Sequence, residues 1–313
     1  MIKNLTVTSS PHVRSARSTR SIMQEVCLAL APAGIAGIIF FGWNALAIMI
    51  TSVISCVVSE YAFQRITHRK ILIGDWSAVV TGLLLAYNIP ANAPLWIPLI
   101  GGMIAIVLVK QCFGGLGGNF MNPALTGRAV LFVSWAGIMS NYPATRFMAM
   151  TDAVSSATPL ALIAGGESVS MTDLLIGNCG GVLGETCKLA IIAGGIYLIA
   201  RRIIDWRIPV CFIGSAFLCY LIQDGPEAAL LQILSGGLML GAFFMATDYV
   251  TCPMSGLGRI IMGIGCGVLL FVIRSYASYI EGCSFAILFM NVMTPLIDRF
   301  TAGRLFGEVK ARG

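Results

Sequence analysis

The sequence has little charge. Asp, Glu, Lys and Arg make up only 11% of the 313 residues, whereas hydrophobic residues make up 57%. Soluble domains carry about 25% charged residues, so this composition excludes an ordinary soluble enzyme. The length fits a single bundle of many membrane spans better than several independent domains.

The chain also lacks the residues of common metal and nucleic-acid sites. Its only histidines, His12 and His68, lie in polar segments, which argues against a zinc site or a histidine-based catalytic dyad. None of the ten cysteines belongs to a C-x-x-C pair, so we interpret them as small hydrophobic residues rather than disulfide or iron–sulfur ligands. The net charge of +6 comes without a basic stripe interleaved with aromatic residues, and no nucleic-acid partner is predicted.

The sequence is rich in long apolar runs. About 20 apolar residues suffice for a helix to cross a bilayer, and we predict an all-α polytopic membrane protein with about ten transmembrane helices. The predicted spans are 22–41, 45–63, 75–89, 95–112, 119–136, 172–200, 208–223, 227–246, 259–274 and 282–298. The bundle 22–298 would lie between a cytoplasmic N-terminal segment, 1–21, and a cytoplasmic tail, 299–313.

Two of the predicted spans are irregular. The third is short and ends at Asn88-Ile89-Pro90, and the sixth is long and interrupted by glycines. Broken helices occur at membrane depth where protein or water surrounds the backbone. Phe120-Met121-Asn122 and Phe289-Met290-Asn291 suggest two five-helix repeats, the arrangement of many transporters. Chance similarity of one tripeptide is the alternative.

The distribution of basic residues orients the bundle. With both termini in the cytoplasm, 16 of the 20 Lys and Arg residues fall in cytoplasmic segments. Arg146 and Arg274 fall outside, and Arg128 and Lys188 lie within spans. Cytoplasmic loops are enriched in Lys and Arg, so loop 137–171 is predicted to be extracytoplasmic, on a bacterial or archaeal cytoplasmic membrane.

Loop 137–171 contains the stretch Asp152-Ala153-Val154-Ser155-Ser156-Ala157-Thr158-Pro159. Considered alone, Ser-Ser-Ala-Thr-Pro is an ordinary loop that leads into a helix N-cap, since Ser and Thr favour loops and caps. Several other motifs, taken together in their order along the chain, give this stretch a second interpretation. These motifs are Ser10-Pro11-His12, Gly114-Gly115-Leu116-Gly117-Gly118-Asn119-Phe120-Met121-Asn122-Pro123-Ala124, Gly184-Glu185-Thr186, Phe244-Met245-Ala246-Thr247-Asp248-Tyr249-Val250-Thr251, Glu281-Gly282 and Met290-Asn291.

With these motifs, nearly the whole chain resembles the RnfD component of the Rnf electron-transport complex and, more distantly, the NqrB component of the sodium-pumping NADH:quinone reductase. The resemblance implies FMN joined to Thr158 through a phosphodiester by a separate flavin transferase. The family's pattern D-x-x-[ST]-[GS]-A-T is matched by Asp152, Ser155, Ser156, Ala157 and Thr158, with Ser156 where glycine is common.

Several further residues are assigned to cofactor or ion sites. Arg146 is a candidate to offset the charge of the phosphate on Thr158. The stretch 114–118 lacks the Lys-Ser/Thr ending of a phosphate-binding P-loop, and its glycines favour close helix packing. The resemblance instead implies a second, non-covalent flavin (riboflavin) near the cytoplasmic half, for which Asn119, Asn122 and Pro123 are the candidate lining residues.

Four ionisable residues, Glu185, Lys188, Asp248 and Asp298, lie in or beside apolar runs. Such charges are costly in a membrane and usually face a partner or a cavity. Asp248 and Glu185 are therefore candidates for an ion path. The simpler alternatives are that Glu185 and Lys188 neutralise each other on one helical face and that Asp248 is an ordinary interfacial residue.

The resemblance implies a membrane component that associates with other Rnf subunits in a ferredoxin:NAD oxidoreductase. It would relay electrons across the membrane, coupled to Na+ or H+ translocation, without a complete active site of its own. The alternatives are a passive channel or solute transporter of related ten-span architecture, the NqrB component of the quinone reductase, and a structural membrane component without a cofactor.

Overall fold

The computed structural model describes residues 17–146, 158–165, 170–277 and 282–302. Its first half contains α1 (Thr19–Phe41), α2 (Trp43–Ile66), the 3-10 turn η1 (Ile73–Asp75), α3 (Ser77–Tyr87), α4 (Trp96–Met103), the π-helix η2 (Ile104–Gln111), α5 (Pro123–Ser134) and α6 (Ala136–Met139). Its second half contains α7 (Pro159–Ala164), α8 (Met171–Ile176), the 3-10 turn η3 (Leu183–Glu185), α9 (Lys188–Ala200), α10 (Arg207–Asp224), α11 (Pro226–Leu234), α12 (Leu238–Leu240), the π-helix η4 (Gly241–Met245), α13 (Gly256–Tyr276) and α14 (Cys283–Thr301).

The described residues form helices and no strand, apart from one isolated bridge between Pro90 and Val182. The predicted all-α polytopic class is therefore confirmed. Five helices, α1, α2, α10, α13 and α14, are long and apolar enough to cross a membrane individually. The other five predicted spans correspond to four shorter apolar helical segments and one bent helix pair.

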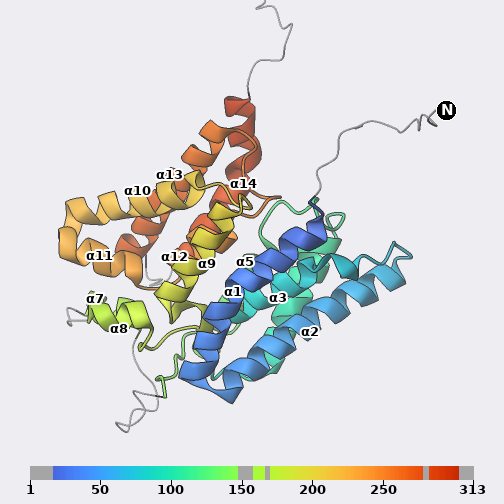
Figure 1. Ribbon diagram of the computed structural model, residues 1–313, viewed down its shortest axis with the longest axis horizontal. Coiled ribbons are helices and arrows are strands. Elements are labelled where there is room, and N and C mark those ends of the chain that lie inside the picture. The colour runs from blue at the N-terminus through green and yellow to red at the C-terminus, as the bar shows by residue number, and fades with distance from the viewer. Residues whose placement is uncertain (1–16, 147–157, 166–169, 278–281, 303–313) are drawn as a thin grey trace, which may run out of the picture.

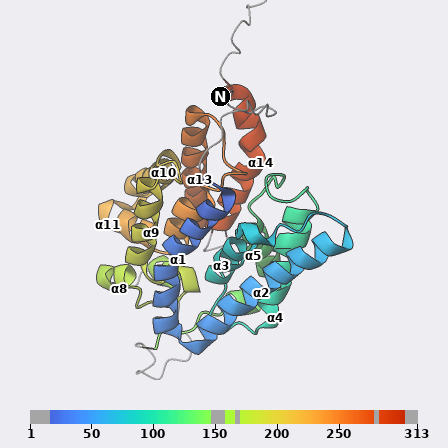
Figure 2. The same ribbon diagram turned by 45° about the vertical axis from the view of Figure 1, so that its right-hand side comes forward.

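The helices form two groups that meet along α1 and α9 (Figures 1 and 2). Helices α2 to α5 lie on one side, and α10 to α14 lie on the other. The contact depends on small residues: a methyl group added to Gly194 of α9 would overlap the carbonyl oxygen of Ala29 in α1. Glycines of this kind let membrane helices approach closely and gain packing contacts. One buried apolar cluster extends through both groups.

Three of the predicted spans are short or interrupted and so differ from continuous membrane helices. Helix α3 has only 11 residues, as the short third span predicts. The sixth span, 172–200, is not one long helix, since α8 and α9 are separated by the turn η3. The eighth predicted span, 227–246, is interrupted as well, because α11 and the α12–η4 segment meet at a bend of 68°. Gly236 in that bend has a φ of +66°, which a residue with a side chain rarely adopts.

Two sequence interpretations need correction. The loop glycines Gly114 and Gly117 have φ of +109° and +97°, and a methyl group added to either would meet no atom within 4 Å, so they shape a loop rather than close a helix contact. Asn122 stands at the N-cap of α5, whereas Asn291 lies inside α14. The two Phe-Met-Asn tripeptides thus do not occupy equivalent positions, although the third and eighth spans, which would be equivalent in two five-span halves, are both interrupted.

Candidate functional site

A largely apolar pocket lies where α1, α3, α5, α9 and η4 come together, at their predicted cytoplasmic ends. It encloses a small cavity of about 80 Å³ that is partly open to the surroundings. Its lining includes Asn119, Asn122 and Pro123, the three residues predicted to line a second flavin site, and the ion-path candidate Asp248. We call it the Asp248 pocket. Apolar walls with a few convergent polar groups are typical of cofactor sites.

The two asparagines are held by the backbone around them. Asn122 is the N-cap of α5, where its Oδ1 accepts a hydrogen bond of 3.2 Å from the N–H of Leu125. Its Nδ2 donates to the carbonyl oxygen of Met245, at 3.2 Å, and so ties α5 to η4. Asn119 donates to the carbonyl oxygen of Met121 at 3.0 Å. Both side chains therefore stabilise the local backbone in addition to lining the pocket.

Asp248 follows η4 in the loop 246–255 and also lines the pocket. Burial raises the pKa of its carboxyl group, although hydrogen bonds from Val250, Thr251 and Tyr249 and the charge of Lys110 act in the opposite direction. The Thr251 hydroxyl donates to Asp248 Oδ2 at 3.3 Å. The structure thus places this partly exposed carboxyl beside a pocket.

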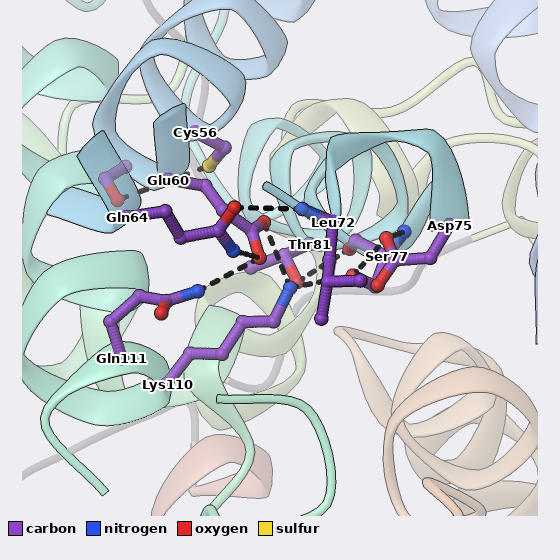
Figure 3. Close-up of polar contacts among 10 residues, drawn as sticks. Cys56, Glu60, Gln64, Leu72, Asp75, Ser77, Thr81, Lys110 and Gln111 are labelled. Carbon is purple, nitrogen blue, oxygen red and sulfur yellow. Dashed lines mark hydrogen bonds and ion pairs between the residues drawn. The ribbon is translucent and has the colours of Figure 1, made fainter. Parts of the chain in front are cut away.

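A buried polar network adjoins the pocket (Figure 3). Glu60 of α2 accepts three hydrogen bonds: from Lys110 Nζ at 2.9 Å, from Gln111 Nε2 at 2.8 Å and from Gln64 Nε2 at 3.1 Å. Lys110 Nζ also donates to Ser77 Oγ at 2.5 Å. The Glu60 and Lys110 side chains are each 2% exposed, so the two charges compensate each other in a desolvated setting.

This network lies between two hollows of the protein. Lys110 and Ser77 line the Asp248 pocket. Glu60 and Gln111 line a second, more polar cleft that also includes Arg69 of the 67–76 loop. The sequence interpretation missed Glu60, even though it is the single carboxylate within the second predicted span, and counted Lys110, near the end of the fourth span, among the cytoplasmic basic residues. A lone charge in an apolar run was the available signal.

A second polar cluster lies where helices are interrupted. Arg128 of α5 donates through Nη1 to Asn88 Oδ1, just after α3, and to Ser284 Oγ near the start of α14, both at 2.9 Å. Asn88 in turn donates to the carbonyl oxygen of Leu84 at 2.7 Å. Arg128 is 5% exposed. Its guanidinium therefore joins α3, α5 and α14 in the middle of the bundle.

The ion-path candidate Glu185 lies near this cluster, but not on a helical face with Lys188. Glu185 ends the turn η3, and Lys188 begins α9, so the expectation of a shared helical face is wrong. Lys188 Nζ donates to main-chain carbonyl oxygens, that of Glu185 at 2.6 Å and that of Gly236 at 2.8 Å. A methyl group added to Gly237 would lie 2.9 Å from Glu185 Oε1 and 3.9 Å from Arg128 Nη1. The Glu185 and Arg128 side chains thus converge on the α11–α12 bend.

Thr158 is the N-cap of α7, and its Oγ1 accepts a hydrogen bond of 3.3 Å from the N–H of Ala161. The capping role that the sequence suggested as the ordinary alternative is therefore present, and the residue is only 6% exposed. Asp152, Ser155, Ser156 and Ala157 lie outside the described residues. Arg146 lies against the turn between α1 and α2, where its N–H donates to the carbonyl oxygen of Phe40 at 2.9 Å.

Helix α7 packs on the interrupted segment of the second half. A methyl group added to Gly236 would come within 2.6 Å of Leu160 Cδ1 and 2.8 Å of Arg274 Nη2. Arg274 of α13 donates to the carbonyl oxygens of Gln232 at 2.8 Å and Ser235 at 3.1 Å, at the C-terminal end of α11. The segment that follows Thr158 is thereby placed directly against the α11–α12 bend.

Comparison with known proteins gives matches along almost the whole chain. A profile described as the NQR2, RnfD, RnfE family matches residues 6–307. The chain is 50% identical to the D component of the Na(+)-translocating ferredoxin:NAD(+) oxidoreductase complex of Acetobacterium woodii, over 99% of this chain and 97% of that protein. It is 41% identical to the D component of the proton-translocating ferredoxin:NAD(+) oxidoreductase complex of Clostridium ljungdahlii, with 97% of each covered. The D component of an ion-translocating oxidoreductase complex from Halorhodospira halophila is 35% identical over 96% of this chain and 95% of its own length.

Proposed function

The chain belongs to the NQR2, RnfD, RnfE family, and from that premise we propose that it is the RnfD component of an ion-translocating ferredoxin:NAD oxidoreductase complex. It acts as a multi-pass protein in a bacterial or archaeal cytoplasmic membrane, together with the other Rnf subunits. It relays electrons across the membrane, and this relay is coupled to movement of Na+ or H+. The observation that carries the proposal is the near-complete match with two relatives named as the D component of ferredoxin:NAD(+) oxidoreductase complexes and a third named as that of an ion-translocating oxidoreductase complex.

Covalent FMN on Thr158 is the first cofactor of the proposal, with Thr158 on the extracytoplasmic side. The match of Asp152 to Thr158 with the family's attachment pattern supports it. The observed geometry is compatible with attachment, because an ester oxygen at Thr158 still accepts the hydrogen bond from Ala161 that caps α7. The 6% exposure of Thr158 implies that the flavin transferase acts on this segment before α7 has packed against the bundle.

A second, non-covalent flavin in the Asp248 pocket completes the relay. The character of the lining supports this, since its walls are mainly apolar and carry a few convergent polar groups. The cavity of about 80 Å³ is smaller than the ~300–1,000 Å³ typical of such sites, so a flavin ring would have to displace lining side chains on binding. Asn119, Asn122 and Pro123 would hold the ring, with Lys110 and Asp248 as the charged groups of the lining. Bound flavins supply one- and two-electron transfer, and Asp248, with its raised pKa, is placed to hold a proton beside the pocket.

The attachment is tested by co-expressing the chain with a flavin transferase and separating it on a denaturing gel. We expect a fluorescent band and, in the peptide that contains Thr158, a mass increase equal to one FMN minus water. Thr158→Val should abolish both, whereas Thr172→Val, in α8, should retain both. Unmodified wild-type peptide, or a fluorescent Thr158→Val band, would contradict the assignment.

A passive channel or solute transporter is the second candidate, and the interrupted helices favour it. The α11–α12 bend of 68° and the short helix α3 are features that transporters use to build sites at mid-membrane. A transporter has no use for a flavin on Thr158. Protein without flavin that nevertheless transports a solute across liposome membranes would establish this alternative.

A further inference from the structure

Lys110 occupies the wall between the Asp248 pocket and the carboxylate of Glu60. Its ammonium is 2.9 Å from Glu60 Oε2 (Figure 3). Lys110 also lines the pocket, together with Ser77 and Asp248. Two of its three N–H donors are used by Glu60 and Ser77. Ser77 is itself fixed, because its hydroxyl donates to Asp75 Oδ1 at 2.6 Å. The ammonium therefore has a defined position at the edge of the pocket.

The position of Glu60 is defined as well. Gln64 Nε2 and Gln111 Nε2 both donate to its Oε1, and Gln64 Oε1 accepts the N–H of Leu72 at 2.9 Å, which fixes the direction of the Gln64 amide. Oε1 is thus held by amides, while Oε2 faces the ammonium. This arrangement provides a buried cation that is paired with the Glu60 carboxylate on the side away from the pocket, while the Asp248 carboxyl lies on the pocket side.

We propose that Lys110 is a positioning residue that stabilises the negative charge gained by a flavin in the Asp248 pocket on reduction, and that Glu60 limits this effect. The inference rests on the proposed second flavin. No bond forms or breaks at Lys110: the electron comes from the partner subunits, and the ammonium keeps its three protons. A structural ion pair that only joins α2 to η2 would have no such effect.

The physical basis is the weak screening of buried charges. Between groups a few ångströms apart, the interaction is several-fold stronger in the protein interior than in water. In the wild-type pair the two charges largely cancel at a distance. Removal of the ammonium leaves the carboxylate and disfavours reduction, whereas removal of the carboxylate leaves the ammonium and favours it. Opposite shifts of the reduction potential are the signature of the proposed role.

The experiment uses the full-length chain, purified in detergent after expression without the flavin transferase, so that Thr158 stays unmodified. Riboflavin is the probe. Its binding is measured by fluorescence quenching, and its midpoint potential is measured by optical redox titration in the bound state. The variants are Lys110→Met, Glu60→Gln and the double variant. Arg274→Gln is the control, because it removes a cation at the far end of the bundle.

We expect Lys110→Met to lower the midpoint potential and Glu60→Gln to raise it. Each shift should correspond to at least tenfold in the reduction equilibrium, about 59 mV for a one-electron couple. The double variant should return close to the wild-type value, and Arg274→Gln should not change it. If Lys110→Met does not accumulate, Glu60→Gln and the double variant still differ by the ammonium alone, and their potentials should differ in the same sense.

The outcomes separate the inference from the proposal on which it rests. Bound riboflavin with one common potential in all variants would overturn the role of Lys110 and leave the second flavin site intact. Wild-type chain that does not bind riboflavin would overturn both the flavin site and this inference. Shifts of the same sign in both single variants would indicate loss of packing and would also overturn it.

Discussion

Lys188 donates a hydrogen bond of 2.8 Å to the carbonyl oxygen of Gly236, and thereby ties the first residue of α9 to the bend between α11 and α12. The same ammonium donates to the carbonyl oxygen of Glu185 at 2.6 Å. Carbonyl groups released by a helix break need a donor at membrane depth. A buried lysine, 1% exposed, supplies it here for two interrupted segments at once.

Replacement of this donor should destabilise the fold. We expect Lys188→Met to lower the free energy of unfolding by about 1–3 kcal/mol, since buried carbonyl oxygens lose their partner. The thermal unfolding midpoint of the detergent-purified chain measures the effect. Lys70→Met removes an exposed lysine from a loop and should leave the midpoint unchanged. Equal midpoints for the two variants would show that the lysine does not hold the bend.

The contact between the two helix groups gives a second prediction. Gly194→Ala places a methyl group against the Ala29 carbonyl oxygen and should cost about 1–3 kcal/mol through overpacking. Gly214, in α10, has no neighbouring atom within 4 Å of an added methyl group. Gly214→Ala should therefore stabilise the helix by up to about 1 kcal/mol. Unfolding midpoints that shift in opposite directions would confirm this; a neutral Gly194→Ala would place the close contact elsewhere.

The Asp248 carboxyl should make the free energy of unfolding decrease as the pH rises. Burial raises the pKa of this carboxyl in the folded chain above its ordinary value of 3.8. The folded state then binds the proton more tightly, so stability decreases from pH 3.8 upward until the folded-state pKa is passed. Asp248→Asn should remove this slope and be relatively more stable at neutral pH. The unfolding midpoint, measured as a function of pH, checks this. Parallel profiles for the wild type and Asp248→Asn would rule out the effect.

The Asp205 carboxyl should have the opposite effect on the pH dependence of the free energy of unfolding. Burial acts to raise the pKa of its carboxyl, but hydrogen bonds from the Arg207 N–H and Arg259 outweigh it and lower the pKa below 3.8. Arg259 Nη1 donates to Asp205 Oδ2 at 2.6 Å. This contribution is fully present above pH 3.8 and is lost as pH falls through the folded-state pKa. Unfolding midpoints between about pH 5 and pH 3 should fall less steeply in Asp205→Asn than in the wild type.

Single-cysteine labelling tests the orientation of the bundle. In a background with the native cysteines replaced by alanine, Gly165→Cys follows α7 and should react with a membrane-impermeant maleimide added to intact cells. Arg202→Cys, in the loop between α9 and α10, should react only after the membrane is permeabilised. Both positions are exposed. The reverse pattern would place Thr158 on the cytoplasmic side and contradict its proposed role.

The sequence predicted those features that depend on local composition. The apolar runs of α1, α2, α10, α13 and α14 are long enough to identify each helix, because a membrane helix satisfies its own backbone hydrogen bonds. The short third span was visible from Asn88-Ile89-Pro90. The bend at Gly236 was missed although Ser235-Gly236-Gly237 interrupts the apolar run, and the lysine that donates to its carbonyl oxygen, Lys188, lies 48 residues away in the chain.

The candidate sites divide in the same way. Asn119, Asn122 and Pro123 belong to a local motif, and the structure brings them together in one pocket with Asp248. Glu60 and Lys110, in contrast, are 50 residues apart, and each alone looks like a charge near the end of a span. The two buried charges compensate each other only because α2 packs against η2. No local sequence pattern predicts that packing.

The order of amino acids by itself determined the membrane class, the approximate spans and the family, because hydrophobic length and contiguous motifs are properties of short segments. Only the tertiary structure decided which buried charges meet, where the helices break and which residues share a pocket. Those outcomes depend on contacts between segments distant in the chain, whose energies arise only after the helices have packed.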